Sequence, residues 1–154
     1  MGFEIEKKFL LKNDDWRNLA PGLHYRQGYL NSAKGRTVRV RTIGDQAFLT
    51  IKGPNNQGVR LEFEYAIPYS DALIMLTQLC QTPIIEKIRH KIHYQGFIWE
   101  VDEFLGENTG LIFAEIELTA PDQIFSKPPW VGAEVTHDPR YYNANLVTHP
   151  FCSW

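Results

Sequence analysis

The sequence predicts a mainly β (α+β) fold, an eight-stranded antiparallel closed barrel with a few peripheral helices. Short stretches that alternate apolar and charged residues recur along the chain, and each ends at a turn signal, which is the pattern of antiparallel strands joined by hairpins. The chain has 154 residues and no linker long enough to separate two domains, so a single domain is expected over residues 1–154. Eight strands in one small domain favour a barrel or a strongly curved sheet.

Turn signals rich in glycine, asparagine and proline set the ends of the predicted strands. These signals are Lys34-Gly35, Gly44-Asp45, residues 53–58, Gln95-Gly96 and residues 106–110. The strands predicted between them cover residues 2–11, 23–31, 36–43, 46–53, 59–67, 84–94, 97–104 and 111–119. Strands therefore account for most of the chain.

The predicted helices are few. A short one follows position 13, where Asn13 or Asp14 can cap it. A longer one covers residues 70–80, in which leucines recur at helical spacing. The last covers residues 139–147, because Asp138 can cap it and a proline occupies its first position.

Charged residues gather on one face of seven predicted strands, since alternate residues of a strand point to opposite sides. In the first strand Glu4, Glu6 and Lys8 share a face, and only apolar residues and Lys7 point the other way. The other charged faces carry Arg39 and Arg41; Thr50 and Lys52; Arg60, Glu62 and Glu64; Lys87, Arg89 and Lys91; Glu100 and Asp102; and Glu115 and Glu117. For any one strand, this pattern also fits the solvated face of a half-buried sheet.

Like charges are neighbours on these faces, which argues against a solvated surface, because adjacent like charges destabilise a sheet. A barrel that turns these faces inward has a charged lumen. Its apolar outer faces then need cover from the helices and from aromatic residues such as Trp16, Trp99 and Trp130. Lysines and arginines inside would bind a highly charged anion, and carboxylates would bind hard divalent cations. A polyphosphate carrying Mg²⁺ or Mn²⁺ satisfies both sets.

Composition limits the other partners. The formal net charge of −2 does not suggest a nucleic acid polymer as partner. The first residues lack the order of a signal peptide and no apolar run is as long as a membrane span, so a cytoplasmic protein without membrane contact is expected. Cys80 and Cys152 lie far apart and have no metal-ligand spacing, which fits free thiols in a reducing compartment.

The run Glu4-Ile5-Glu6-Lys7-Lys8 has the E-x-E-x-K form of the CYTH domain, or triphosphate tunnel metalloenzyme, superfamily, and the chain resembles this family over roughly residues 2–148. Further blocks follow in the family's order: Gln27-Gly28-Tyr29-Leu30, Val38-Arg39-Val40-Arg41, Thr50-Ile51-Lys52, Glu62-Phe63-Glu64-Tyr65, Lys87-Ile88-Arg89, Glu100-Val101-Asp102, residues 114–118 and Glu134-Val135-Thr136. The chain closely resembles the short bacterial subgroup with inorganic triphosphatase activity. The resemblance implies an eight-stranded tunnel that binds a linear triphosphate and one or two metal ions.

The resemblance also implies roles for individual residues. The metal-binding carboxylates would be Glu4, Glu6, Glu115 and Glu117, holding Mg²⁺ or Mn²⁺. The phosphate-binding cations would be Lys8, Arg39, Arg41, Lys52 and Arg89, and Lys91 is added because it shares the face of Arg89. Glu62, Glu64 and Asp102 would support the lumen, either as outer partners of the metal or by holding the cations in place.

Two residues are candidates for the general base. Lys87 lies on the face of Lys91 and Arg89, where burial and like charges would lower its pKa, although nearby carboxylates act in the opposite sense. The family resemblance places Tyr29 near the tunnel, but a phenol needs strong help from metal or cations to act as a base. Tyr29 fits equally well as an aromatic packed at the tunnel end.

The leading hypothesis is metal-dependent hydrolysis of inorganic triphosphate to pyrophosphate and phosphate. The alternatives are a class IV-type adenylate cyclase, a hydrolase of an organic triphosphate such as thiamine triphosphate or ATP, and a non-catalytic binder of polyphosphate or nucleotide. A pure anion binder has no use for the four carboxylates assigned to metal. A monomer and a homodimer both remain possible, and the tail ending in Trp154 could pack on its own barrel or on a neighbouring subunit.

Overall fold

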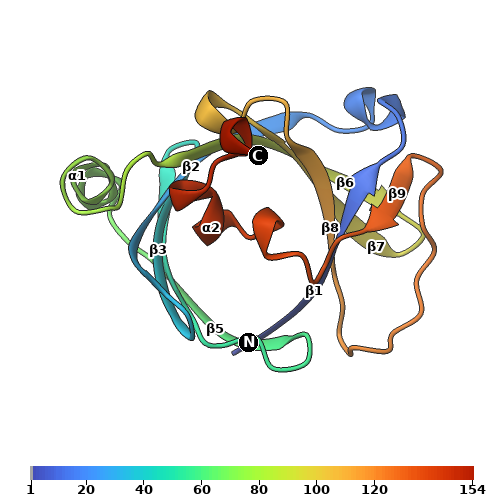
Figure 1. The fold of residues 1–154 in the computed structure, drawn as a ribbon, viewed down its shortest axis with the longest axis horizontal. Helices are drawn as coiled ribbons and strands as arrows, with labels where there is room; N and C mark the ends of the chain where they lie inside the picture. Colours follow the sequence, from blue (N-terminus) through green and yellow to red (C-terminus); the bar gives the residue numbers. More distant parts are fainter. Residues whose placement is uncertain (1) are drawn as a thin grey trace.

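Eight antiparallel strands form a closed ring in the computed structural model (Figure 1). The structure describes residues 2–154, so Met1 of the predicted domain lies outside the described residues. The strands are β1 (Phe3–Leu11), β2 (Gly22–Ala33), β3 (Arg36–Ile43), β4 (Gln46–Lys52), β5 (Val59–Ala66), β6 (Ile85–Tyr94), β7 (Phe97–Phe104) and β8 (Ile112–Glu117). Their order is β5-β4-β3-β2-β6-β7-β8-β1, and pairing of Phe3 with Leu61 helps to join β1 to β5 and close the ring. The eight predicted strands are confirmed, with ends within two residues of those expected.

A short ninth strand, β9 (Val131–Glu134), was not predicted. It pairs with the end of β1 near Phe9 and Leu11, next to a shift in register. Its four residues show no alternation of apolar and charged side chains, so the sequence pattern carries no strand signal there. Its pairing depends on a partner more than 100 residues away in the chain.

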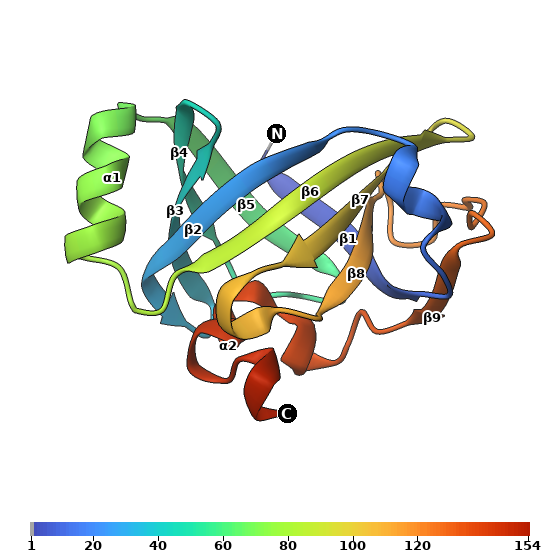
Figure 2. The same ribbon diagram turned by 90° about the horizontal axis from the view of Figure 1, so that it is seen from above.

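Helix α1 (Tyr69–Gln78) lies outside the barrel, as predicted (Figure 2). Its buried Ala72 and Leu76 pack against Val40 and Ala47, so this helix covers the outer faces of β3 and β4. The short helix near the N-terminus is a single 3₁₀ turn, η1 (Asp15–Asn18). The position of α1 on the outside of the barrel agrees with the prediction of peripheral helices (Figure 2).

The C-terminal segment corrects two predictions. The single helix expected over 139–147 is divided into η3 (Pro139–Tyr141) and α2 (Asn143–Thr148), because Tyr142 between them has an extended backbone. Asp138 caps η3 as predicted, accepting a hydrogen bond from the backbone of Arg140. The helix α2 is not peripheral, since it lies across one end of the barrel (Figures 1 and 2).

This end of the barrel is filled with apolar side chains. Leu146 and Val147 of α2 belong to one buried cluster with Phe104 and Phe113 of the barrel wall. The tail forms a further turn, η4 (Phe151–Ser153), whose first backbone N–H donates to the buried Asn108. The tail therefore packs on its own barrel, and η3, α2 and η4 together (residues 139–153) form what we call the C-terminal plug.

The outer faces of the remaining strands are covered as expected. Trp16, Trp99 and Trp130 are all buried in one cluster that also includes Phe9 and the partly buried Phe125. The segment between β8 and β9 supplies Phe125 and Trp130 to this cluster, because it runs over the outside of the sheet. None of the helices described in residues 2–154 is long and apolar enough to cross a membrane.

Candidate active site

Buried charged side chains line the inward face of the barrel, as the alternation of the strands predicts. Glu4 and Lys8 of β1, Arg39 of β3, Lys87 and Arg89 of β6, Asp102 of β7 and Glu115 of β8 are each less than one-tenth exposed. Burial of charge is costly unless each group has a partner. The pairings of these groups therefore describe the site.

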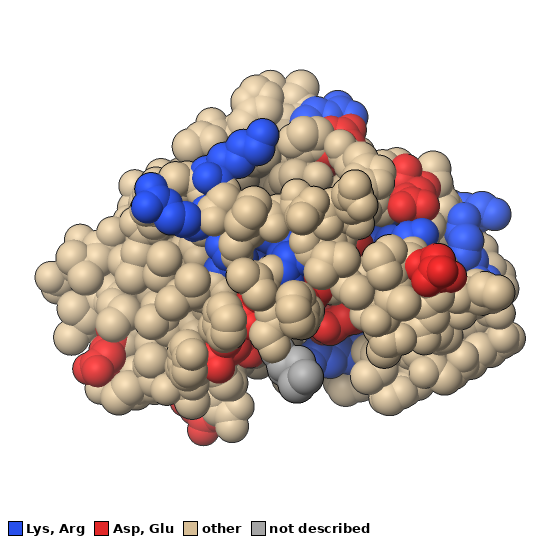
Figure 3. All heavy atoms as spheres, turned by 90° about the horizontal axis from the view of Figure 1, so that it is seen from below, with Lys and Arg blue, Asp and Glu red and all other residues tan. Residues whose placement is uncertain are grey.

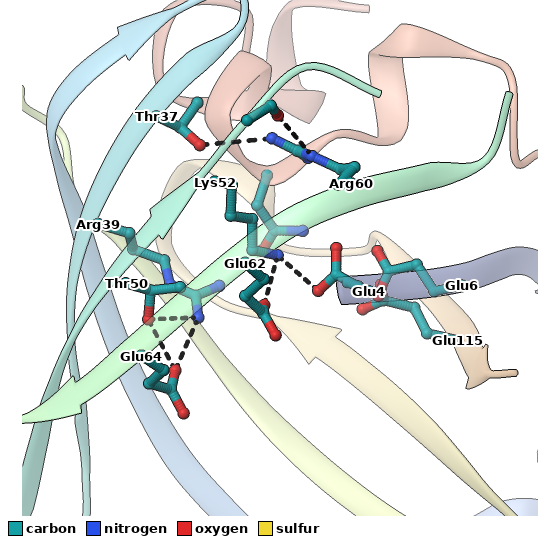
Figure 4. Close-up of polar contacts among 12 residues, drawn as sticks. Glu4, Glu6, Thr37, Arg39, Thr50, Lys52, Arg60, Glu62, Glu64 and Glu115 are labelled. Atoms are coloured by element: carbon teal, nitrogen blue, oxygen red, sulfur yellow. Dashed lines mark hydrogen bonds and ion pairs between the residues drawn. The ribbon is translucent and has the colours of Figure 1, made fainter. Parts of the chain in front are cut away.

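A carboxylate cluster forms where β1 meets β8. Glu4, Glu6 and Glu115 point toward one another in Figure 4. The pairing of Lys8 with Glu115 in the sheet brings their side chains together, and Lys8 Nζ donates to Glu115 Oε2 at 2.8 Å. Lys8 also lies 3.5 Å from Glu6, so one ammonium serves two carboxylates.

The pKa values of Glu6 and Glu115 are shifted in opposite directions. Burial and then the charges of Glu115 and Glu4 raise the pKa of Glu6 well above its usual range. Burial alone would also raise the pKa of Glu115, but Lys8 and Arg89 hold it well below the usual range. Glu6 is thus the member of this cluster that keeps a proton, which a divalent cation would displace on binding.

A second pair of carboxylates, Glu62 of β5 and Glu4 of β1, shares Lys52 of the adjacent strand β4. Lys52 Nζ donates to Glu4 at 2.8 Å and lies 3.4 Å from Glu62 (Figure 4). Burial acts to raise the pKa of Glu4, but Lys52 and a hydrogen bond with Glu62 lower it to about 2. Burial and the same contact with Glu4 raise the pKa of Glu62 to about 7. Of this pair, Glu62 carries the proton near neutrality.

Arg39 and Arg41 lie side by side on the inward face of β3 and share the carboxylate of Glu64. Glu64 Oε2 lies 3.5 Å from Arg39 and 3.3 Å from Arg41, and it accepts a hydrogen bond from Thr50 at 2.7 Å. Burial and the charges of Arg39 and Arg89 lower the pKa of Arg41 to about 10. The Nε atoms of Arg39 and Arg41 are buried and have no hydrogen-bond partner. These unused donors suit an anion with several oxygens.

Arg89 and Lys87 share Asp102 near the closed end of the barrel. Arg89 donates to both oxygens of Asp102, at 2.7 and 2.8 Å, and its other contacts reach Glu115 and Glu100. Lys87 Nζ lies 2.9 Å from Asp102 Oδ2. Burial and the adjacent Arg89 lower the pKa of Lys87 to about 7, although Asp102 acts to raise it.

The two candidate bases lie in different surroundings. Lys87 belongs to the polar network just described. Tyr29 is buried in the apolar cluster with Ile85, Phe104 and Phe113 at the plugged end. The structure therefore gives Tyr29 the surroundings of a packing aromatic.

Two predicted site residues lie apart from the others. The Lys91 side chain is half exposed, and its Nζ comes no nearer than 3.9 Å to Glu100. Glu117 is classed with the exposed residues, although it pairs with Glu6 in the sheet. Partial loss of solvent and the charges of Glu4 and Glu100 raise its pKa. Both residues are on the predicted face but outside the buried network.

Sequence reasoning assigned no role to several residues of the network. The ring of Tyr25 lies 5.1 and 5.0 Å from the guanidinium groups of Arg41 and Arg89, within cation–π range. The alternation of the strands could have identified Tyr25 and Glu100 as site residues. Tyr25 shares a strand face with Tyr29, and Glu100 shares one with Asp102, and both of these partners were assigned roles. Asn143, which contacts Lys87, carried no such signal, since its contact depends on where α2 docks.

The inward-facing carboxylates have the chemistry to bind a divalent cation. Within residues 2–154, no three or more carboxylate, imidazole or thiolate side chains are already arranged as a complete metal site. Oε1 of Glu4 is buried and has no hydrogen-bond partner, so it has an unused acceptor next to Glu6 and Glu115. Hard cations such as Mg²⁺ prefer carboxylate oxygens. Glu4, Glu6 and Glu115 are therefore the residues that could hold such an ion.

Comparisons with known proteins identify the family of this chain. The sequence matches the CYTH domain over residues 2–149. It is 53% identical to an inorganic triphosphatase of Acetivibrio thermocellus, an alignment that covers 98% of this chain and 97% of the relative. It is 34% identical to an inorganic triphosphatase of Nitrosomonas europaea, over 94% of this chain and 96% of that one.

A solved structure with a similar fold also covers nearly the whole chain. The crystal structure of the inorganic triphosphatase NE1496 superposes with a TM-score of 0.67 at 32% identity, covering 93% of this chain and 96% of that chain. Family match, relatives and fold all extend over nearly the whole length. The chain therefore belongs to the CYTH domain family.

Proposed function

We propose that this protein hydrolyses inorganic triphosphate to pyrophosphate and phosphate inside the barrel, with Mg²⁺ or Mn²⁺ as cofactor. One observation carries the proposal: buried arginines with unused donors face buried carboxylates with an unused acceptor, in the same interior. A linear triphosphate with a bound divalent cation complements both sets. The 53% identity to an inorganic triphosphatase supports this substrate over other triphosphates.

In this proposal the cations hold the substrate. Arg39 and Arg41 bind phosphate oxygens through their forked guanidinium groups, and Lys8, Lys52 and Arg89 neutralise further charge. Lys91 and Glu117, which are exposed, act at the rim of the site. Because each cation is already paired with a carboxylate, the substrate meets a preorganised field rather than mobile side chains.

Glu4, Glu6 and Glu115 would hold the metal ion, and Glu62, Glu64 and Asp102 keep the cationic side chains in place. When bound, the ion supplies positive charge to the phosphate oxygens and lowers the barrier to attack. These carboxylates serve as ligands because oxygen donors match a hard cation. The same set distinguishes an enzyme from an anion binder.

Lys87 acts as the general base. A pKa of about 7 leaves much of its amine neutral at neutral pH, where it can accept a proton from water. The water oxygen attacks the terminal phosphorus, its proton passes to Lys87 Nζ, and the bond to the bridging oxygen breaks, so that pyrophosphate leaves. Tyr29 packs the closed end instead.

A phosphate-release assay tests the function. We expect turnover of triphosphate with Mg²⁺ or Mn²⁺, weaker release from ATP and no cyclic AMP, with near-total loss in Glu4→Gln. Metal-dependent cyclic AMP without triphosphate turnover would overturn the proposal in favour of a cyclase. Tight binding of triphosphate without turnover of any substrate would overturn it in favour of a binder.

We further propose a cytoplasmic location and no nucleic acid partner. Cys80 and Cys152 are both free thiols, which suits a reducing compartment. The arginines of the site face inward, whereas binding of a duplex needs cations on the protein surface that contact its phosphate backbone.

A further inference from the structure

We infer that Asn143, the first residue of α2, is a positioning residue that orients the amine of Lys87. The inference rests on the function proposed above, in which Lys87 accepts a proton. It assigns the C-terminal plug a part in the reaction, beyond closing one end of the barrel.

Asn143 contacts two buried polar side chains of the barrel wall. Its Oδ1 accepts hydrogen bonds from Lys87 Nζ and from Gln27 Nε2, both at 3.1 Å. Lys87 and Gln27 are 1% and 0% exposed, so bulk solvent competes little for these bonds. A side chain of the plug is thus the acceptor for groups on β6 and β2.

The second acceptor at Lys87 is Asp102 Oδ2, at 2.9 Å. A neutral amine has two N–H bonds and one lone pair. When Asp102 and Asn143 each accept from one of the two N–H bonds, the orientation of the amine is fixed. The lone pair then occupies the fourth position of the nitrogen and points in a single defined direction. Loss of either acceptor frees the amine to rotate, and a base must be aligned with the proton that it removes.

Asn143 provides this alignment without adding charge. The charged or titratable groups around Lys87 are Arg89 on its own strand, Asp102 of β7, Glu115 of β8 and Tyr25 of β2. The helix α2 contributes no charged residue. An amide therefore leaves the amine free to lose its proton near neutrality, whereas a carboxylate at the same position would favour the ammonium form.

The position of Asn143 is set by the packing of the plug. Leu146, one turn further along α2, is fully buried against the barrel wall. The backbone N–H of Phe151 donates to the buried Asn108 at 2.8 Å and ties the following turn to the β7–β8 connection. These contacts fix the start of α2 over Lys87.

Steady-state kinetics of Asn143→Ala test the inference, with Asn145→Ala as the matched control. Asn145 is exposed on the same helix, and its side chain donates only to the Pro139 carbonyl. We expect Asn143→Ala to lower kcat for triphosphate by roughly 10- to 100-fold with little change in KM, because orientation and not binding is lost. Asn145→Ala should keep wild-type kinetics.

The pH profile of Asn143→Asp supplies a readout that a purely structural role would not move. This near-isosteric variant keeps an acceptor but adds a negative charge. We expect the rising limb of kcat against pH to move to higher pH by about one unit or more. In a Lys87→Ala background, Asn143→Ala should have no further effect on kcat.

Wild-type kcat in Asn143→Ala, or a pH profile of Asn143→Asp that superposes on the wild type, would overturn the inference. If Asn143→Ala does not fold, the profile of Asn143→Asp decides alone. Failure of the proposed function is distinct, because it would show as no triphosphate turnover in the wild-type protein.

Discussion

Arg39 and Arg41 stand next to each other on one face of β3, where two like charges would ordinarily destabilise the sheet. The structure tolerates them because Glu64 lies within 3.5 Å of both. One carboxylate does not satisfy two guanidinium groups, and the buried Nε of each remains without a partner. Stability alone does not explain such an arrangement, whereas binding of a polyanion does.

We expect Arg41→Ala to lower kcat/KM for triphosphate by about 100-fold or more, since an inward-facing guanidinium with a buried, unused Nε donor is lost. Arg36→Ala is the matched control, because Arg36 is an exposed arginine at the start of the same strand. Phosphate release by both variants gives the comparison. Equal loss in the two would mean that charge in general, and not the inward position, matters.

The proton on Glu62 makes cation binding depend on pH. The pKa of about 7 means that this carboxyl is largely protonated at pH 6 and ionised at pH 8. We expect Mg²⁺ or Mn²⁺ to bind more tightly as the pH rises through 7 and to release protons at pH 6. Calorimetric titrations in two buffers of different ionisation enthalpy measure this release. Glu62→Gln should reduce this release without abolishing it, because Glu6 also carries a proton that the cation displaces. An unchanged release in that variant would exclude Glu62 as a source.

At the scale of single elements, α2 has only six residues and a capping residue, Tyr142, with no side-chain hydrogen bond to the helix. A helix this short is unstable alone. Its stability comes from packing, and Leu146 and Val147 provide that packing against Phe104 and Phe113. The plug and the interior of the barrel therefore depend on the same contacts.

We expect Leu146→Ala to lower the free energy of unfolding by about 2–5 kcal/mol, because it leaves a cavity at a fully buried site. Ile74→Ala is the control, since Ile74 lies on α1 and is 53% exposed. Its effect should stay within about 0.5 kcal/mol. Urea unfolding of both variants measures the difference. Similar small losses would show that α2 is not packed in the barrel end.

At the scale of the whole molecule, the ring brings together cations and carboxylates from strands that are not direct neighbours. Lys52 of β4 reaches Glu4 of β1 across the intervening β5, and Arg89 of β6 reaches Glu115 of β8 across β7. On the side where β5 lies, both positively and negatively charged side chains are visible in the centre of the face, and further charged residues lie toward its edges (Figure 3). The barrel therefore holds a network of buried cations and carboxylates although the net charge of the chain is only −2.

A ligand that joins several walls should stabilise the whole barrel. We expect triphosphate, without added metal, to raise the thermal unfolding midpoint, and the gain at 100 times Kd corresponds to about 2.7 kcal/mol. Sulfate at equal ionic strength is the control for general screening. The rise should be lost in Arg41→Ala. An equal rise with sulfate would indicate that triphosphate acts only as a salt.

Strand alternation determined which residues face inward, because the two-residue period of a strand is local and can be read from neighbours in the chain. The same local rules gave the hairpin turns, the eight strands and the outer position of Trp99. The tertiary structure alone decided the rest: the register in which β1 pairs with β5, the pairing of β9, the exposure of Lys91 and Glu117, and the contact of Asn143 with Lys87. Each of these depends on residues far apart in sequence. Their meeting depends on how the ring closes and where the plug docks, which no local period encodes.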